Sequence, residues 1–189
     1  FKGGTCLAKV HAEFYRLSED LDFAIPMVVD ARRVERSREI DPVKQVLKDL
    51  FHAVPELHEE EALAGTNSSM QYIGTLSYES LLLHRRETIK IEISLREPRL
   101  QPAGPHDAAT ILMNPLSQRS LVPPVQFACI TKQEAFAEKF RAAMTRREPA
   151  IRDYFDIDYA VANGVIDPHD RSDGEGETTG AGQRGDRCV

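Results

Sequence analysis

The 189-residue chain carries 24 Lys and Arg residues against 30 Asp and Glu residues, a formal net charge of −6, and 41% of its residues are hydrophobic. This composition is typical of a soluble globular protein of about one domain, and its charge argues against a protein that coats nucleic acid through bulk electrostatics. No apolar run approaches the roughly 18 residues of a membrane helix, and the start of the chain lacks the pattern of a signal peptide.

The cysteines indicate the cellular compartment of the protein, and the two ends of the chain indicate which parts are ordered. The 3 cysteines lie far apart, which favours free thiols in a reducing cytoplasm. The chain begins at Phe1 without an initiator methionine, so we expect N-terminal structure to be missing. From about Arg171 the residues are almost all small or polar, and we expect residues 166–189 to be disordered.

A glycine-rich turn opens the chain and leads into a helix. Gly3 and Gly4 permit a tight turn, and Thr5 is able to cap the helix that follows. Apolar or partly apolar side chains then recur at helical spacing at Leu7, Val10, His11 and Phe14.

The next segment predicts a strand that presents two carboxylates on one face. Leu21, Phe23 and Ile25 alternate with other residues, which is the period of a strand. The same alternation places Asp20 and Asp22 together on the opposite face.

Further helix and strand signals follow. Asp41-Pro42 predicts a helix start, with proline at the first helical position. We expect the three glutamates at 59–61 to form a solvated helix face, and we predict strands at 70–76 and 78–83.

The clearest strand is Thr88–Arg96, where isoleucine and leucine alternate with polar residues. Glu92 lies on its polar face. If this strand pairs beside the one that carries Asp20 and Asp22, Glu92 could complete a metal site or deprotonate an attacking hydroxyl. An exposed sheet face with Lys–Glu pairs is an equally good interpretation.

The second half of the chain predicts helices. Residues 98–126 are rich in proline and turn formers and are typical of a connection. Thr131-Lys132-Gln133-Glu134 matches a capping box that opens one helix. Another helix runs from Ile151 to about Ala162 and ends at a plausible Asn163-Gly164 cap.

These elements predict an α+β fold. We expect a core with a small mixed sheet over residues 1–97, a connection over 98–126 and a helical C-terminal subdomain over 127–165.

Three features together predict a site for phosphate and metal. Hard divalent cations favour carboxylates together with substrate phosphate oxygens, which the pair Asp20 and Asp22 could supply. The Gly-Gly-Thr turn and the helix after it offer backbone N–H groups to an anion. A basic cluster suits triphosphate or an RNA end: Lys139, Arg141, Arg146, Arg147 and Arg152.

Each of these features also has an ordinary structural interpretation. A D-x-D pair alone is more often a solvent-facing edge strand, a Gly-Gly-Thr is more often only a turn, and a basic helix is more often only solvated. Other classes are disfavoured, because the chain has no G-x-S-x-G, Walker A or G-x-G-x-x-G motif. The histidines show no metal-ligand spacing.

The chain resembles the AbiEii-type toxin family of nucleotidyltransferases from Phe1 to about Asn163. The resemblance rests on FKGGT at 1–5 and RLSEDLDF at 16–23. Two downstream motifs follow in the same order as in the family: Lys139-x-x-Ala142-x-x-x-Arg146 and Arg152-Asp153-x-x-Asp156.

This resemblance implies a polymerase-β-like nucleotidyltransferase core followed by a helical C-terminal region. It implies the toxin of a bacterial toxin–antitoxin pair, with a cognate antitoxin as partner, that transfers a nucleoside monophosphate from an NTP. In some relatives the acceptor is a tRNA 3′ end. The cofactor would be Mg²⁺ or Mn²⁺.

The resemblance also implies roles for residues. Gly4, Thr5 and Arg146 would contact the nucleotide, and Asp20 and Asp22 would hold the metal as catalytic ligands. Lys139 would act in catalysis and pair with phosphate charge. Asp153 would be a catalytic or structural acid near the acceptor, and Glu92 would be a third metal ligand.

Two alternatives to this enzyme remain open on the sequence. One is a catalytically inactive nucleotidyltransferase-like scaffold that binds a nucleotide or a partner protein. The other is a sugar transferase, because D-x-D also occurs in nucleotide-sugar sites, although the Gly-Gly-Thr turn disfavours it.

Overall fold

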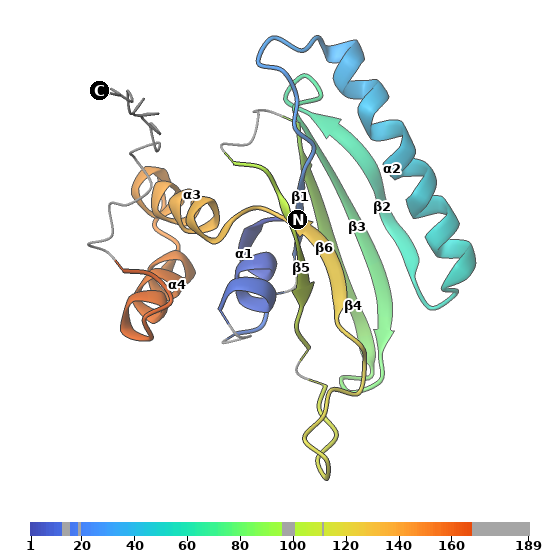
Figure 1. The fold of residues 1–189 in the computed structure, drawn as a ribbon. Helices are drawn as coiled ribbons and strands as arrows, with labels where there is room; N and C mark the ends of the chain where they lie inside the picture. The colour runs from blue at the N-terminus through green and yellow to red at the C-terminus, as the bar shows by residue number, and fades with distance from the viewer. Residues whose placement is uncertain (13–15, 19, 96–100, 111, 168–189) are drawn as a thin grey trace, which may run out of the picture.

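A four-stranded mixed sheet forms the centre of the computed structural model, which describes residues 1–12, 16–18, 20–95, 101–110 and 112–167. The strand order is β1-β4-β3-β2 (Figure 1). The strands are β1 (Leu21–Ala24), β2 (His58–Thr66), β3 (Gln71–Ser80) and β4 (Arg85–Ser94). β1 runs parallel to β4, and the other pairs are antiparallel. The predicted α+β class with a small mixed sheet is therefore confirmed.

Helix α2 (Arg33–Ala53) covers one face of this sheet (Figure 1). The alternating apolar residues of β3 and β4 point toward it and form the main core with Ile40, which is fully buried. Leu21 and Phe23 of β1 pack against the same core. Because successive side chains of a strand point to opposite faces, Asp22 and Glu92 lie on the face away from α2.

The first residues of the chain tie the sheet to the C-terminal half. The Lys2 amide donates to the Asp22 carbonyl at 2.8 Å, and the Ile130 amide donates to the Phe1 carbonyl at 3.1 Å. The N-terminus continues into α1 (Gly3–Cys6) and a turn of π-helix (Leu7–His11). A two-stranded ladder, β5 (Gly104–Ala108) with β6 (Val125–Cys129), completes the β structure.

Two helices, α3 (Lys132–Thr145) and α4 (Ile151–Ala162), lie beside α1 on the side of the sheet away from α2 (Figure 1). The predicted caps of both are confirmed: the Thr131 hydroxyl accepts from the Glu134 amide, and Gly164 follows α4 with φ +65°. A second core holds this layer to the N-terminus: Leu7, Ile130, Ala135, Phe136 and Ala160.

Four predictions about local structure were wrong. Thr5 does not cap the first helix, because α1 begins at Gly3 and Thr5 lies inside it. Helix α2 begins at Arg33 rather than Asp41, because Glu35 accepts from the Arg32 amide at 2.7 Å and caps an earlier start. The glutamates at 59–61 lie in strand β2, where backbone pairing with β3 holds an edge strand that is almost wholly exposed. The two strands predicted at 70–76 and 78–83 are one strand, β3.

The predicted connection over 98–126 holds more structure than expected, since it contains β5 and the start of β6. The predicted division into regions stays a prediction, as does the disordered tail, of which residues 168–189 lie outside the described ranges. Ile166 still packs against the second core. None of the helices in the described part of the chain is both long enough and apolar enough for a membrane crossing.

Pro42 gives a test of where α2 begins. Inside a helix, proline lacks the N–H that would bond to the carbonyl four residues earlier, at Arg38, whereas at a first helical position it lacks nothing. We therefore expect Pro42→Ala to raise the free energy of unfolding by about 1–3 kcal/mol in denaturant titrations. An unchanged or lower stability would place the helix start at Asp41 instead.

Candidate active site

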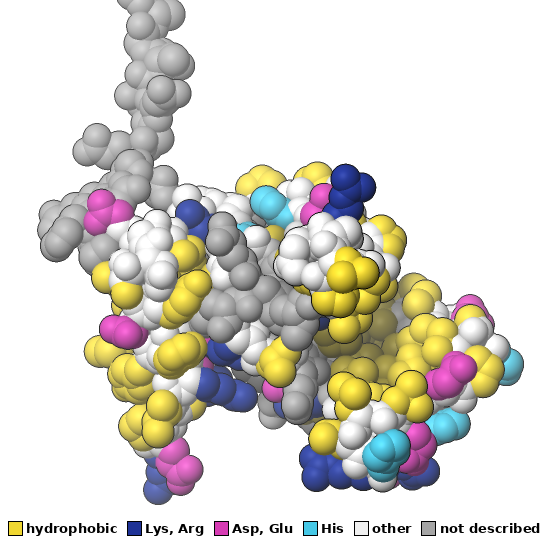
Figure 2. All heavy atoms as spheres, turned by 90° about the horizontal axis from the view of Figure 1, so that it is seen from below, with side chains coloured by type: hydrophobic (Ala, Val, Ile, Leu, Met, Phe, Trp, Pro, Cys, Tyr) yellow, Lys and Arg dark blue, Asp and Glu magenta, His cyan; other side chains and the backbone are white. Residues whose placement is uncertain are grey.

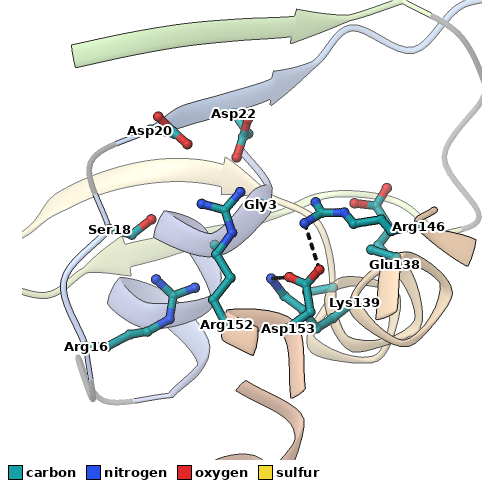
Figure 3. Close-up of a pocket in the computed structure, with 13 residues that line it drawn as sticks. Gly3, Arg16, Ser18, Asp20, Asp22, Glu138, Lys139, Arg146, Arg152 and Asp153 are labelled. Atoms are coloured by element: carbon teal, nitrogen blue, oxygen red, sulfur yellow. Dashed lines mark hydrogen bonds and ion pairs between the residues drawn. The ribbon is translucent and has the colours of Figure 1, made fainter. Parts of the chain in front are cut away.

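A polar pocket of about 150 Å³ lies where β1, α1, α3 and α4 meet (Figure 3). Its lining combines the two ends of the described chain: Gly3, Gly4, Arg16, Ser18, Asp20, Asp22, Ala135, Glu138, Lys139, Ala142, Arg146, Arg152 and Asp153. Most of the residues predicted for the site, although up to about 150 positions apart in sequence, therefore share one pocket.

Asp20 and Asp22 form the acidic side of the pocket (Figure 3). Burial, followed by the nearby carboxylates of Glu92 and Asp20, raises the pKa of Asp22 from 3.8 to about 6. Lys2 and Lys90 oppose this rise in the pKa of Asp22. The acids thus repel one another, and a cation placed among them would relieve that repulsion.

Glu92 stands next to Asp22, because the two residues are direct partners in the parallel pairing of β1 and β4. Its carboxylate accepts hydrogen bonds from the Gln71 amide and from the Lys90 ammonium, the latter at 3.0 Å. Glu92 itself lies outside the pocket lining. No three Asp, Glu, His or Cys side chains of the described ranges are close enough to hold a metal ion together. The third-ligand role of Glu92 therefore stays a prediction.

The position of Gly3 next to Asp22 can be occupied only by glycine. Its φ is +74°, and a Cβ atom at this position would come within 1.9 Å of the Asp22 carboxylate oxygen. A side chain is excluded both by backbone conformation and by space. Gly3 therefore acts by admitting the Asp22 carboxylate to the pocket, a role that the predicted turn did not anticipate.

Thr5 is almost completely buried in α1, at 2% exposure. Its hydroxyl donates to the backbone carbonyl of Asp20 and does not line the pocket, whereas Gly4 does. The structure thus places Thr5 behind Asp20, where it fixes the start of β1. The predicted contact of Thr5 with a nucleotide stays a prediction.

The opposite side of the pocket is a network of ion pairs built on α4. Asp153 is fully buried and pairs with Lys139 at 3.0 Å and with Arg146 at 2.8 Å. Asp156 is one helical turn further on, is also fully buried, and pairs with Lys139 at 2.9 Å. Because the side chains at i and i+3 of a helix share a face, the two aspartates hold Lys139 between them.

Arg16 joins this network from a distant part of the chain. Its guanidinium donates to both carboxylate oxygens of Asp156, at 2.5 and 2.7 Å. Neither residue was assigned a role from the sequence. Asp156 carried a signal, since it falls one turn after Asp153 in the Arg152-Asp153-x-x-Asp156 motif, but nothing in the sequence connects it to Arg16, 140 positions away.

Two more residues line the pocket that were assigned no role from the sequence. Glu138 of α3 pairs with Lys2 at 2.7 Å and so closes the pocket wall beside α1. Ser18 lies near Gly4, and its hydroxyl would be 3.3 Å from a Cβ at that position. In Figure 3 the Arg152 side chain extends from α4 toward the strand that carries Asp20 and Asp22.

Replacing Gly3 tests this geometry, with Gly164 as a matched control. We expect Gly3→Ala to lower the free energy of unfolding by about 2–4 kcal/mol, because it combines a positive φ with a clash against Asp22. Gly164 also has a positive φ, but nothing lies within 4 Å of its Cβ position, so Gly164→Ala should cost only about 1 kcal/mol. Equal losses in chemical denaturation would contradict the predicted clash.

The raised pKa of Asp22 has a consequence for stability. Between about pH 4 and pH 6 the folded protein keeps a proton that the unfolded chain has released, so stability falls as the pH rises through this window. The cost of ionising Asp22 is complete above about pH 6 and absent below about pH 4.

We therefore expect Asp22→Asn to raise the free energy of unfolding at about pH 7.5 by roughly 1–2 kcal/mol, and this gain should shrink toward about pH 4. Thermal melts at both pH values check this expectation. Asp107→Asn, at an exposed position of β5, is the control and should change neither melt. A variant at Asp22 that is destabilised at the higher pH would show that the carboxylate is favourably solvated.

One comparison with solved structures gave a match. The crystal structure of JHP933 from Helicobacter pylori matches 85% of this chain at 17% identity, with a TM-score of 0.48. The chain spans 56% of the length of that structure. No curated protein matches the chain.

A protein family matches most of the sequence. Its description is nucleotidyl transferase AbiEii toxin, type IV toxin–antitoxin system, and it covers residues 1–173. This range includes β1, with Asp20 and Asp22, and both helices that carry the ion-pair network. The chain belongs to the AbiEii family of nucleotidyl transferase toxins of type IV toxin–antitoxin systems.

Proposed function

We propose that this chain is the catalytic part of a Mg²⁺-dependent nucleotidyltransferase with a polymerase-β-like core. It moves a nucleoside monophosphate from an NTP to an acceptor hydroxyl, with a tRNA 3′ end as the acceptor. The observation that carries the proposal is the separation of charge in one pocket: the Asp20–Asp22 pair faces lysine and arginine side chains from α3 and α4. Membership of the AbiEii family supports it.

The architecture agrees with this proposal. A small mixed sheet is covered on one face by α2 (Figure 1), and Asp22 lies on the opposite face, in the edge strand β1, with Asp20 just before this strand. Helices α3 and α4 then form the second wall of the pocket. A polymerase-β-like core followed by a helical region accounts for this arrangement of one sheet and two flanking layers.

The charges of the pocket favour a metal-dependent reaction. The lining contains four basic and four acidic side chains, so by itself it has no net attraction for a polyphosphate. Burial first, and then the nearby carboxylates of Glu92 and Asp20, raise the pKa of Asp22, so a cation beside these acids would be bound favourably. Mg²⁺ or Mn²⁺ held by Asp20 and Asp22 would supply this positive charge, and would make the pocket positive overall.

Bound at these acids, the metal would stabilise negative charge on the reacting phosphate and on the attacking oxygen. The chain itself would do the rest. Lys139 and Arg146 would contact the phosphates, since ammonium and guanidinium groups form short, charge-assisted hydrogen bonds to them. Gly4 would contact the nucleotide through its backbone, since it lines the pocket without a side chain of its own. Glu92 would complete the metal site or accept the proton of the acceptor hydroxyl.

Asp153 has a supporting role in this mechanism. Its carboxylate is fully buried and is engaged by Lys139 and Arg146, so it holds both cations at the pocket wall. Fixed charges of this kind stabilise a transition state without having to reorganise during the reaction. Asp153 would therefore act through Lys139 and Arg146, rather than as an acid on the acceptor.

Removal of either metal-binding carboxylate tests the function. We expect Asp20→Ala and Asp22→Ala each to lower the transfer of labelled nucleotide to RNA by at least about 100-fold, since a metal contributes several kcal/mol to the transition state. The assay contains Mg²⁺, each labelled NTP in turn and total tRNA. Asp30→Ala, an exposed position outside the pocket, should transfer label like the unmodified protein.

The outcome also separates the enzyme from its alternative, a scaffold that binds nucleotide or a partner without turnover. Calorimetric binding of an NTP with no transfer to any RNA would favour the scaffold. Full transfer by the Asp20→Ala and Asp22→Ala variants would overturn the metal-binding role of the pair.

A further inference from the structure

We propose that Arg16 binds the terminal phosphates of the nucleoside triphosphate, and that the buried carboxylate of Asp156 positions it. This inference rests on the proposed function and adds a residue to its substrate site. It is drawn from the place of Arg16 in the pocket, from its partner and from the glycine against which it lies.

Asp156 holds Arg16 in a defined orientation. The Nε and Nη2 atoms of Arg16 bind the two oxygens of Asp156 at 2.5 and 2.7 Å, and Nη1 donates to the Leu17 carbonyl at 3.0 Å. A two-pronged pair of this kind sets both the direction and the plane of the guanidinium. The Asp156 side chain is 0% exposed, whereas that of Arg16 is 19% exposed. The pair therefore has a buried anchor and a tip that reaches the pocket.

Two ion pairs allow the Asp156 carboxylate to be buried. A carboxylate without water is costly unless it is paired, and Asp156 is paired on both oxygens by Arg16 and Lys139. Both of these cations line the pocket, but Asp156 does not. A single buried acid behind the wall thus presents two positive groups to the same cavity. Lys139 is already assigned to phosphate in the proposed function, and Arg16 shares its anchor.

Gly4 supplies a second, independent observation. A Cβ atom at Gly4 would lie 2.9 Å from Arg16 Nη2, so the guanidinium occupies the space that a side chain would need. Gly3 makes the same allowance for Asp22. The two adjacent glycines therefore admit one group each: the metal-binding carboxylate and the Arg16 guanidinium.

The position of Arg16 in the pocket indicates which phosphates it would contact. In Figure 3, Arg16 lies across the pocket from Asp20 and Asp22. The acids mark the reacting phosphate, so the phosphates that leave would extend away from them, toward the basic side. A guanidinium carries five N–H donors in one plane, so it can bind Asp156 and Leu17 and contact a phosphate oxygen at the same time.

The competing explanation is that the pair is only a structural link between the segment before β1 and α4. The two explanations differ in what they predict for ligands of different charge. A phosphate-binding Arg16 distinguishes a triphosphate from a monophosphate, whereas a structural link treats both alike.

The experiment measures the affinity of the full chain for each of the four NTPs and for the matching NMPs, with Mg²⁺, by calorimetry. We expect Arg16→Gln to weaken NTP binding by about 10- to 100-fold, since charge-assisted hydrogen bonds are lost, and to change NMP binding by less than about twofold. Arg38→Gln, an exposed arginine of α2 outside the pocket, is the matched control and should change neither.

Two further variants keep the test decisive. Arg16→Lys retains the charge beside Asp156 and preserves the fold, but it loses the two-pronged geometry, so we expect a smaller loss that is again confined to the NTPs. Asp156→Asn should weaken NTP binding in the same selective way and at least as strongly, because it releases both Arg16 and Lys139; the Arg16 variants alone decide the role of Arg16. If Arg16→Gln does not fold, Arg16→Lys decides the question.

The outcomes separate this inference from the function on which it rests. If the unmodified protein binds no NTP, the proposed function fails. Two results would overturn the inference and make Arg16 only a structural link. In the first, the Arg16 variants bind the NTP as tightly as the unmodified protein does. In the second, they lose affinity for the NTP and for the NMP by the same factor.

Discussion

The buried carboxylates of Asp153 and Asp156 are the constraint on which the candidate active site depends. Both are fully buried on α4, and a buried charge persists in a folded protein only when it is paired. Their partners come from α3, from the link after α3 and from the segment before β1. Satisfying these two acids therefore draws three separate parts of the chain to one wall, and the same pairing turns lysine and arginine side chains toward the pocket.

On the acidic side of the pocket, formed by Asp20 and Asp22, the charges are not balanced in this way. Asp22 is half-buried beside other carboxylates, and its raised pKa shows that the folded chain pays for ionising it. Gly3 holds a positive φ so that this carboxylate has room. Unfavourable charge and backbone geometry at one place are typical of a site shaped by function rather than by stability. The pocket thus joins a wall whose buried acids are paired with lysine and arginine to a wall where a half-buried acid lies close to other carboxylates.

Local rules predicted much of the fold correctly, and their failures have physical reasons. The alternation in β4, the Thr131 cap and the Gly164 cap are short-range signals, and the structure has all three. The rules failed where distant contacts outweigh them. Three consecutive glutamates form an edge strand because β3 offers backbone partners, and α2 continues through Pro42 because the buried Ile40 before it packs in the same core as the residues after it.

The sequence by itself determined the chemical groups of the candidate site and the family of the chain: the carboxylate pair, the glycines before it and the basic helix after it. Spacing of two residues is enough to indicate the carboxylate pair, because the geometry of a strand is local. Only the tertiary structure decided which groups meet. It put Glu92 beside Asp22, placed Thr5 behind Asp20 and joined Arg16 to Asp156 across 140 positions, since ion pairs between distant segments depend on how the layers pack and leave no periodic trace in the sequence.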